Sequence, residues 1–159
     1  MRAVFVMQEP VMFTIRPDND AEHRREIANR LRAANRAHCA WLRANPSAAE
    51  TRNFLAFDGG RLIGGAVGFV RFGWYFLDLL YVDAACRNRG LGRQLLTAAE
   101  HFARDRQLVG VRLDTADFQA RGFYEKMGYT LFGELADCPP GHSLYFLPSY
   151  TTKIHRPPK

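Results

Sequence analysis

The sequence has 159 residues, of which 47% are hydrophobic and 13% aromatic, so it can bury the core of one compact domain and is too apolar for a disordered chain. Its formal net charge of +6 favours anionic ligands, but the basic residues are spread without a long cationic run, which argues against a nucleic-acid-binding protein. No apolar run approaches the ~20 residues that a membrane-spanning helix needs, and the three cysteines fit neither a disulfide framework nor a metal site, so we predict a cytoplasmic protein with no membrane segment and no metal.

The first predicted elements are a strand and one or two helices. Met12–Ile15 is a short β-prone run that ends at Arg16. The polar residues 18–20 offer oxygens for a helix N-cap, and apolar residues at helical spacing follow them. We therefore expect one or two helices over residues 21–44, closed by Asn45 and Pro46.

A pair of strands is predicted next, over residues 53–57 and 62–70. Asp58, Gly59 and Gly60 between them tolerate the positive φ values of a tight hairpin, so the strands should pair antiparallel. Gly64 and Gly65 inside the second strand suggest a bulge or the close approach of another backbone or a ligand. The strongest strand signal follows, over residues 74–82.

From Gly90 the pattern becomes helical, and residues 109–115 form another strand. A strand, a long helix and a strand within about thirty residues are typical of a βαβ unit, so we expect residues 74–82 and 109–115 to pair in parallel. A short helix over residues 119–127 and two strands over 129–134 and 143–147 complete the predicted fold. We predict a single domain over residues 1–150 and a disordered basic tail over 151–159.

The most specific segment is the junction between the strand 74–82 and the helix that begins near Gly90. A helix N-terminus presents unpaired N–H groups and a partial positive charge, and glycines there let the backbone approach a phosphate group. A dinucleotide-binding loop would need a small residue where Leu95 stands, and a Walker loop would need Lys and Ser or Thr after Gly92. Another phosphate-binding turn and a plain glycine-rich turn remain as interpretations.

Two motifs resemble those of the GNAT superfamily of acyl-CoA transferases. Arg87-x-x-Gly90-x-Gly92 is similar to its Gln/Arg-x-x-Gly-x-Gly/Ala signature, and Phe123-Tyr124-x-x-x-Gly128-Tyr129 to its Phe-Tyr-x-x-x-Gly-Phe/Tyr segment. The resemblance covers residues 16–147 and is strongest over 77–129. It implies a mixed α/β fold: a twisted, mostly antiparallel sheet of six or seven strands, helices on both faces, and one parallel strand pair at the acyl-CoA cleft.

The resemblance also implies where acetyl-CoA binds. In the family, a bulge in the strand that corresponds to residues 79–82 splays it from the next strand, and the pantetheine arm pairs with the freed backbone. The residues that this assigns to the cofactor are Leu80, Tyr81 and Val82 on the strand, Arg87, Asn88, Arg89, Gly90, Leu91, Gly92 and Arg93 at the pyrophosphate, and Gln119 and Phe123 in the later motif.

Tyr124 and Asp78 are the candidate catalytic residues. Tyr124 corresponds to the family tyrosine that protonates the leaving thiolate, and a phenol with a reference pKa of about 10 holds its proton at neutral pH. Asp78 is a carboxylate in an apolar strand, so it is either the acceptor of the amine proton or a salt-bridged structural residue, and Phe76 falls nearest the family's usual glutamate. Weaker candidates for the proton acceptor are His142, Asp117 and Glu134.

The activity that the resemblance implies is direct transfer of an acetyl group from acetyl-CoA to a primary amine of a small molecule or peptide, without a metal. The alternative is a catalytically inactive acyl-CoA-binding module of the same fold. The acceptor side would involve Trp41, Trp74, Tyr75 and the loop 138–142, unless these aromatic residues belong to the core. The family also implies a possible homodimer.

Overall fold

The computed structural model describes residues 14–45 and 50–151, and the chain divides into two compact units, Met1–Pro46 and Ser47–Lys159. The first unit contains α1 (Ala21–His38) and α2 (Ala40–Ala44). Asp20 caps α1, since its carboxylate accepts a hydrogen bond from the Glu22 N–H at 2.7 Å. The helices predicted over residues 21–44 are confirmed, while the single domain stays a prediction.

The two ends of the chain are described only in part. Thr14 and Ile15 have no regular secondary structure, so the strand predicted over residues 12–15 is wrong for these two, and Met12 and Phe13 lie outside the described residues. Thr151 is held by its hydroxyl, which donates to the Leu108 carbonyl at 2.6 Å. The rest of the predicted tail lies outside the described residues, and its disorder stays a prediction.

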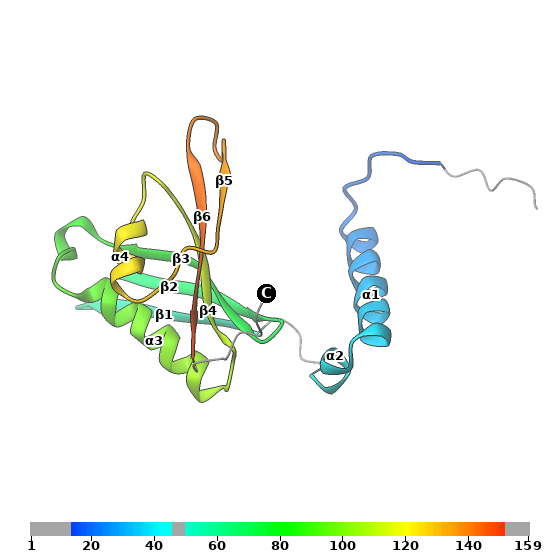
Figure 1. Ribbon diagram of the computed structural model, residues 1–159, viewed down its shortest axis with the longest axis horizontal. Helices are drawn as coiled ribbons and strands as arrows, with labels where there is room; N and C mark the ends of the chain where they lie inside the picture. Colours follow the sequence, from blue (N-terminus) through cyan, green and yellow to red (C-terminus); the bar gives the residue numbers. More distant parts are fainter. Residues whose placement is uncertain (1–13, 46–49, 152–159) are drawn as a thin grey trace, which may run out of the picture. The chain divides into compact units, whose positions relative to one another are not determined.

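A six-stranded sheet forms the second unit, in the order β1-β2-β3-β4-β6-β5 (Figure 1). Neighbouring strands are antiparallel except β3 and β4, which are parallel. The predicted mixed α/β fold with one parallel pair is therefore confirmed. The strands are β1 (Thr51–Asp58), β2 (Arg61–Arg71), β3 (Trp74–Val82), β4 (Gly110–Ala116), β5 (Gly133–Ala136) and β6 (Ser143–Tyr150).

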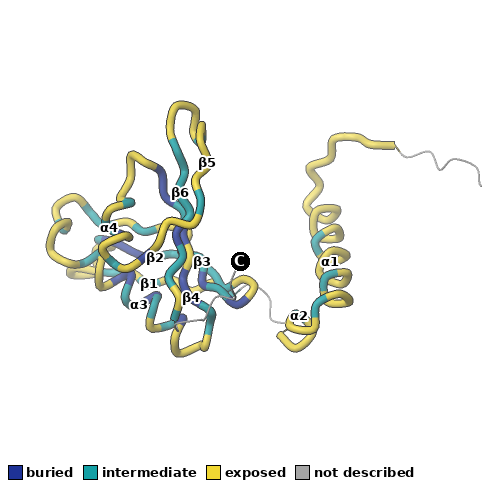
Figure 2. The backbone as a smooth tube through the Cα atoms, in the orientation of Figure 1, coloured by how far each residue is buried: buried dark blue, intermediate teal, exposed yellow. Residues whose placement is uncertain are grey.

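The core of this unit lies between the sheet and the helices that follow β3 and β4. The short 3₁₀ helix η1 (Ala84–Cys86) leads into α3 (Leu91–Asp105), and α4 (Arg121–Lys126) follows β4. The apolar face of α3, with Leu96 and Ala99 fully buried, packs on the same cluster as Tyr75 and Leu77 of β3 (Figure 2). This burial explains why α3 forms where the 3.6-residue periodicity predicted it.

The predicted close approach at the glycines of β2 is confirmed. A Cβ atom on Gly64 would lie 2.8 Å from the Tyr81 carbonyl oxygen, and one on Gly65 would lie 2.8 Å from Leu55 Cδ2. Any side chain at Gly64 would therefore push β2 away from β3, the strand that carries the candidate site.

The last predicted helix and strand are shorter in the structure. The helix expected over residues 119–127 is α4, Arg121–Lys126, and the strand expected over 129–134 begins only at Gly133. Before Gly133, the Thr130 and Phe132 N–H groups bond the Pro148 and Phe146 carbonyls of β6 at 3.2 and 2.9 Å, without continuous pairing. Local β propensity could not show where pairing with β6 begins.

Candidate active site

A bulge in β3 places Asp78 outside the regular pairing. Gly68 of β2 pairs with Leu77, but the preceding Val67 pairs with Leu79, so Asp78 is the extra residue. The family resemblance implied a bulge in residues 79–82, and the structure has it one residue earlier. Because a bulge increases the local twist, the strand changes direction at Asp78.

The parallel pairing of β3 and β4 ends at this bulge. It runs from Trp74 and Gly110 to Leu77 and Leu113, whereas β4 continues to pair with β6 as far as Ala116. Residues 79–82 of β3 therefore pair with β2 on one side and with no described strand on the other. This splayed edge offers peptide groups to an extended ligand, and it contains the predicted residues Leu80, Tyr81 and Val82.

The turn after β3 leaves the N-terminus of α3 without a side-chain cap. Gly90 occupies the N-cap position with φ 82° and ψ 0°, and no side chain bonds the first N–H groups of the helix there. Asn88 also has a positive φ, 59°. Backbone N–H groups and the positive end of the α3 dipole are therefore available to an anion at this junction.

The three arginines of the junction differ in what they contact. The Arg87 Nε donates to the Val82 carbonyl at 3.0 Å, so this side chain folds back onto the end of β3 and stabilises the turn. Arg89 and Arg93 are exposed. The prediction that all three surround the pyrophosphate stays a prediction, and Arg87 has a structural contact that the sequence did not indicate.

Three predicted cofactor residues meet beside the junction. A Cβ atom on Gly92 would lie 3.7 Å from the Phe123 ring and 3.8 Å from Val82 Cγ2. The end of β3, the first turn of α3 and the start of α4 therefore converge on one place. Gln119 lies nearby in sequence, but its Oε1 accepts the Ala116 N–H at 2.9 Å and the Thr115 hydroxyl at 3.1 Å, which holds the end of β4.

Tyr124 lies in a buried cluster of aromatic rings. Its side chain makes T-shaped contacts with Phe123 and Tyr129, and burial raises the pKa of Tyr124 to about 12. The phenol is therefore protonated at neutral pH. Burial, and then the charge of Glu100 and its hydrogen bond with Tyr129, raise the pKa of Tyr129 too.

Asp78 is exposed at the bulge, and within residues 14–45 and 50–151 no ion pair involves it. The salt-bridged alternative is therefore not supported by the described structure. Phe76, which falls nearest the family's usual glutamate, packs on Phe69 at a centroid distance of 5.3 Å. Asp78 thus supplies the carboxylate of this strand, and it does so from the bulge and not from a regularly paired position.

Asp114 is a neighbour of Asp78 that the sequence analysis missed. It follows Leu113, the last β4 residue paired with β3, as Asp78 follows Leu77. Burial, and then the negative charge of Asp78, raise the pKa of Asp114, while Arg112 partly offsets the rise. The alternation of β4 could have marked Asp114 as facing away from the core, but only the register places it beside Asp78.

The weaker proton-acceptor candidates form a separate group where β4 ends. His142 Nδ1 lies 2.9 Å from Asp117 Oδ1, and the Ser143 hydroxyl donates to Glu134 at 2.7 Å. Desolvation would raise the pKa of Asp117, but hydrogen bonds from the Ser143 N–H and His142 outweigh it and lower this pKa. These contacts hold the β5–β6 hairpin against the loop after β4, which gives all three residues a structural role.

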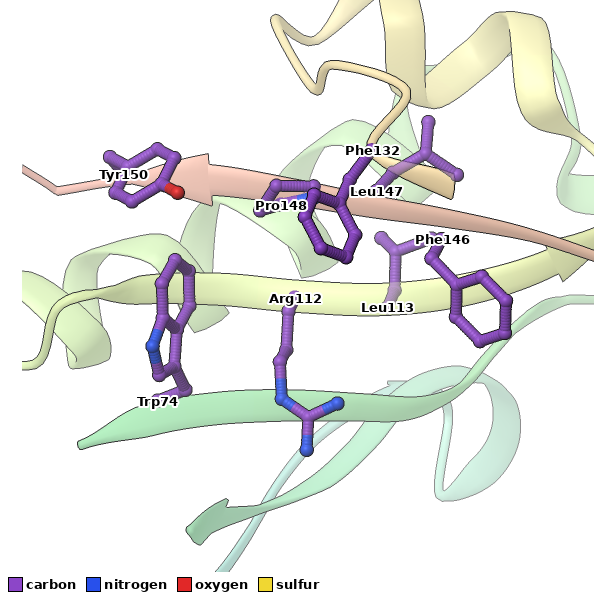
Figure 3. A pocket seen from close by; sticks show the side chains of 8 residues that line it. All are labelled: Trp74, Arg112, Leu113, Phe132, Phe146, Leu147, Pro148 and Tyr150. Atoms are coloured by element: carbon purple, nitrogen blue, oxygen red, sulfur yellow. The ribbon is translucent and has the colours of Figure 1, made fainter. Parts of the chain in front are cut away.

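A groove of about 250 Å³ lies on the sheet face opposite α3 (Figure 3). Trp74 and Tyr150 meet at one end, with ring centroids 5.0 Å apart, and the Arg112 side chain reaches over the Phe76 ring. Trp74 lines this groove, and its part in an acceptor wall stays a prediction. Tyr75 belongs to the core, because it is fully buried and its hydroxyl donates to the Arg52 carbonyl at 2.8 Å. Trp41 belongs to the N-terminal unit.

A parallel strand pair that opens beside an uncapped helix N-terminus is the arrangement that the GNAT resemblance implied for an acyl-CoA transferase. The sequence profile of the acetyltransferase (GNAT) family matches residues 12–129. The chain therefore belongs to this family, and the predicted membership of the acyltransferase class is confirmed.

Two relatives and one solved structure agree with this assignment, and a second solved structure shares the fold. The chain is 45% identical over 89 residues to the blasticidin-S acetyltransferase of Streptomyces morookaense, covering 55% of this chain and 65% of that protein. It is 34% identical over 128 residues to an acetyltransferase of Agrobacterium fabrum, covering 80% of this chain and 90% of that protein.

The structure of an acetyltransferase from Bacillus cereus superimposes with a TM-score of 0.75 at 26% identity, over 86% of this chain and 97% of that one. An aminoglycoside 6'-N-acetyltransferase complexed with coenzyme A gives a TM-score of 0.60 at 20% identity, over 69% of this chain and 76% of that one. The second likeness shows the fold alone.

Proposed function

We propose that this protein transfers the acetyl group of acetyl-CoA directly to a primary amine of a small molecule or peptide. The observation that carries the proposal is the splayed edge of β3 over residues 79–82, which ends at the uncapped N-terminus of α3. A thioester bound there supplies an activated acetyl group. The edge pairs with the pantetheine arm, while the junction binds the pyrophosphate.

In this proposal the chain contributes positioning and proton transfer. The N–H groups of residues 88–93 hold the diphosphate, with Arg89 and Arg93 adding charge, and Leu80, Tyr81 and Val82 orient the arm through their peptide groups. Tyr124 keeps its proton at neutral pH and donates it, or a hydrogen bond, to the departing sulfur. A carboxylate at the start of the splay, where Asp78 lies, accepts the proton of the amine.

The acceptor that we test first is blasticidin S, because the relative that acetylates it is 45% identical over the matched 89 residues. The apolar groove that contains Trp74 and Arg112 supports an acceptor with an apolar body. We also propose a cytoplasmic protein, consistent with three free cysteines, Cys39, Cys86 and Cys138, and a homodimer, as is common in the family. The described helices include none long and apolar enough to cross a membrane.

The test is a screen of acceptors with acetyl-CoA that follows the release of free thiol. The panel contains blasticidin S, other amine antibiotics, polyamines, amino acids and peptides with free N-termini, and mass spectrometry identifies the acetylated product. We expect turnover with at least one amine. Binding of acetyl-CoA without turnover across the panel would instead support the inactive acyl-CoA-binding module.

A further inference from the structure

Two aspartates occupy equivalent positions at the vertex where β3 and β4 separate. Leu77 and Leu113 are the last paired residues of the parallel strands, and Asp78 and Asp114 come directly after them. Asp78 is set apart by the bulge, and Asp114 stays in the regular pairing of β4 with β6, opposite Phe146. The two carboxylates are close enough for the charge of Asp78 to act on Asp114.

Asp114 also lies on the face of the sheet that carries the apolar groove. Its strand alternates regularly, so Asp114 and Arg112 project to the same side, and Val111 and Leu113 project into the core. Phe146, the β6 partner of Asp114, lines the groove together with Arg112. Phe146 thus connects the groove to the position of Asp114, at the end nearest the splayed edge of β3.

We propose that Asp114 acts with Asp78 as a carboxylate pair that binds the ammonium group of the acceptor and takes its proton at Asp114. This inference rests on the proposed function. The acceptor arrives as R-NH₃⁺ and gives one proton to Asp114, which leaves the neutral amine. The C–N bond then forms at the thioester carbon as the C–S bond breaks. The thiolate takes up the second proton of the nitrogen, through Tyr124, and Asp114 releases its proton to water.

The surroundings of Asp114 make it a better proton acceptor than an ordinary aspartate. In the sheet unit, the charged groups that act on it are Asp78 from β3 and Arg112 from its own strand, and β6 contributes the uncharged Phe146. Burial and the charge of Asp78 raise the pKa of Asp114, and Arg112 opposes them. A carboxylate with a raised pKa holds a proton from an amine more readily than an ordinary aspartate does.

The experiment compares four single variants with the wild type on the amine found in the screen. Asp114→Asn should lower kcat/KM by about 100-fold or more and leave the affinity for acetyl-CoA unchanged by calorimetry. Asp105→Asn, at the C-terminal end of α3, is the matched control and should retain wild-type kcat/KM. Asp78→Asn and Arg112→Gln test what sets the pKa of Asp114, because they remove charges of opposite sign from its neighbourhood.

The acidic side of the profile of kcat/KM against pH distinguishes a proton acceptor from a structural residue, because a purely structural role of Asp114 would not shift it. Asp114 must be ionised to accept a proton, so kcat/KM falls as the pH drops through its pKa. Removing the negative charge of Asp78 lowers this pKa and moves the acidic side of the profile to lower pH, and removing the positive charge of Arg112 moves it to higher pH. Carbon-13 NMR of the Asp114 carboxyl should show the same opposite shifts in protein without ligand.

Each outcome decides between the inference and the proposed function. Wild-type turnover that persists in Asp114→Asn with an unchanged pH profile would overturn the role of Asp114 and leave the acetyltransferase intact. An unchanged pKa of the Asp114 carboxyl in both Asp78→Asn and Arg112→Gln, as measured by carbon-13 NMR, would also overturn this role. A wild-type protein that acetylates no amine would remove the proposed function and this inference with it.

Discussion

At the scale of single residues, the environment of Tyr124 decides what its phenol can do. The ring is enclosed by Phe123 and Tyr129, and its pKa of about 12 keeps the proton on the oxygen throughout the neutral range. Such a group serves as a hydrogen-bond or proton donor and not as a base. Asp114, whose pKa is also raised by burial, is suited to the opposite direction of proton transfer.

Tyr124→Phe should lower kcat by about 100-fold or more, because it removes the donor to the leaving sulfur and keeps the ring that packs in the cluster. The affinity for acetyl-CoA should change little, as measured by calorimetry. Tyr129→Phe is the matched control: it removes the other phenol of this ring cluster and keeps its ring, so turnover should be retained. Equal turnover in wild type and Tyr124→Phe would make Tyr124 a packing residue.

At the scale of secondary-structure elements, the site depends on how β3 ends and α3 begins. Asp78 interrupts the pairing of β3, and Gly90 starts α3 in a left-handed conformation that side chains rarely adopt. The two features lie at opposite ends of the segment 78–90, an arrangement that suits a ligand with an extended arm and an anionic end.

Gly90→Ala should reduce stability by about 1–2 kcal/mol, because alanine is strained at φ 82°, and should also weaken acetyl-CoA binding by distorting the junction. Gly60→Ala carries a similar strain, at φ 86° in the β1–β2 turn with open space around it. The control should lose comparable stability in urea unfolding and bind acetyl-CoA as wild type does. If both variants bind equally well, the α3 N-terminus does not hold the pyrophosphate.

The elements that local patterns specify were predictable, and the contacts between them were not. Apolar periodicity located α3, and the hairpin glycines located the β1–β2 turn within one or two residues. The placement of Asp78 near Asp114 depends on the register of strands 36 residues apart in the chain, which no local pattern contains. Arg87 and Tyr75 were assigned from motif and composition, but hydrogen bonds to the Val82 and Arg52 carbonyls fix their positions.

At the scale of the whole molecule, the net charge of +6 suits a protein that binds a polyanionic cofactor, but charge alone does not place the ligand. The splay and the junction are both part of the packed sheet unit, between β2, α3 and α4. Binding there should therefore stabilise the unit as a whole and not order one loop.

Acetyl-CoA at 100 times its Kd should stabilise the fold by about 2.7 kcal/mol, which corresponds to a Tm higher by about 5–10 °C for a protein of this size. Calorimetry gives the Kd, and a thermal melt gives the shift.

Pantetheine, which has the extended arm but no diphosphate, should shift the Tm much less at equal concentration, because it uses the β3 edge and leaves the junction with Arg89 and Arg93 unfilled. Added salt should narrow the difference between the two ligands, since it screens those exposed charges. Equal Tm shifts from the two ligands would show that the junction is not part of the binding site. A site that is preformed in the packed unit must couple ligand binding to unfolding. The absence of a Tm shift at millimolar acetyl-CoA would therefore contradict the assignment of acetyl-CoA as the cofactor.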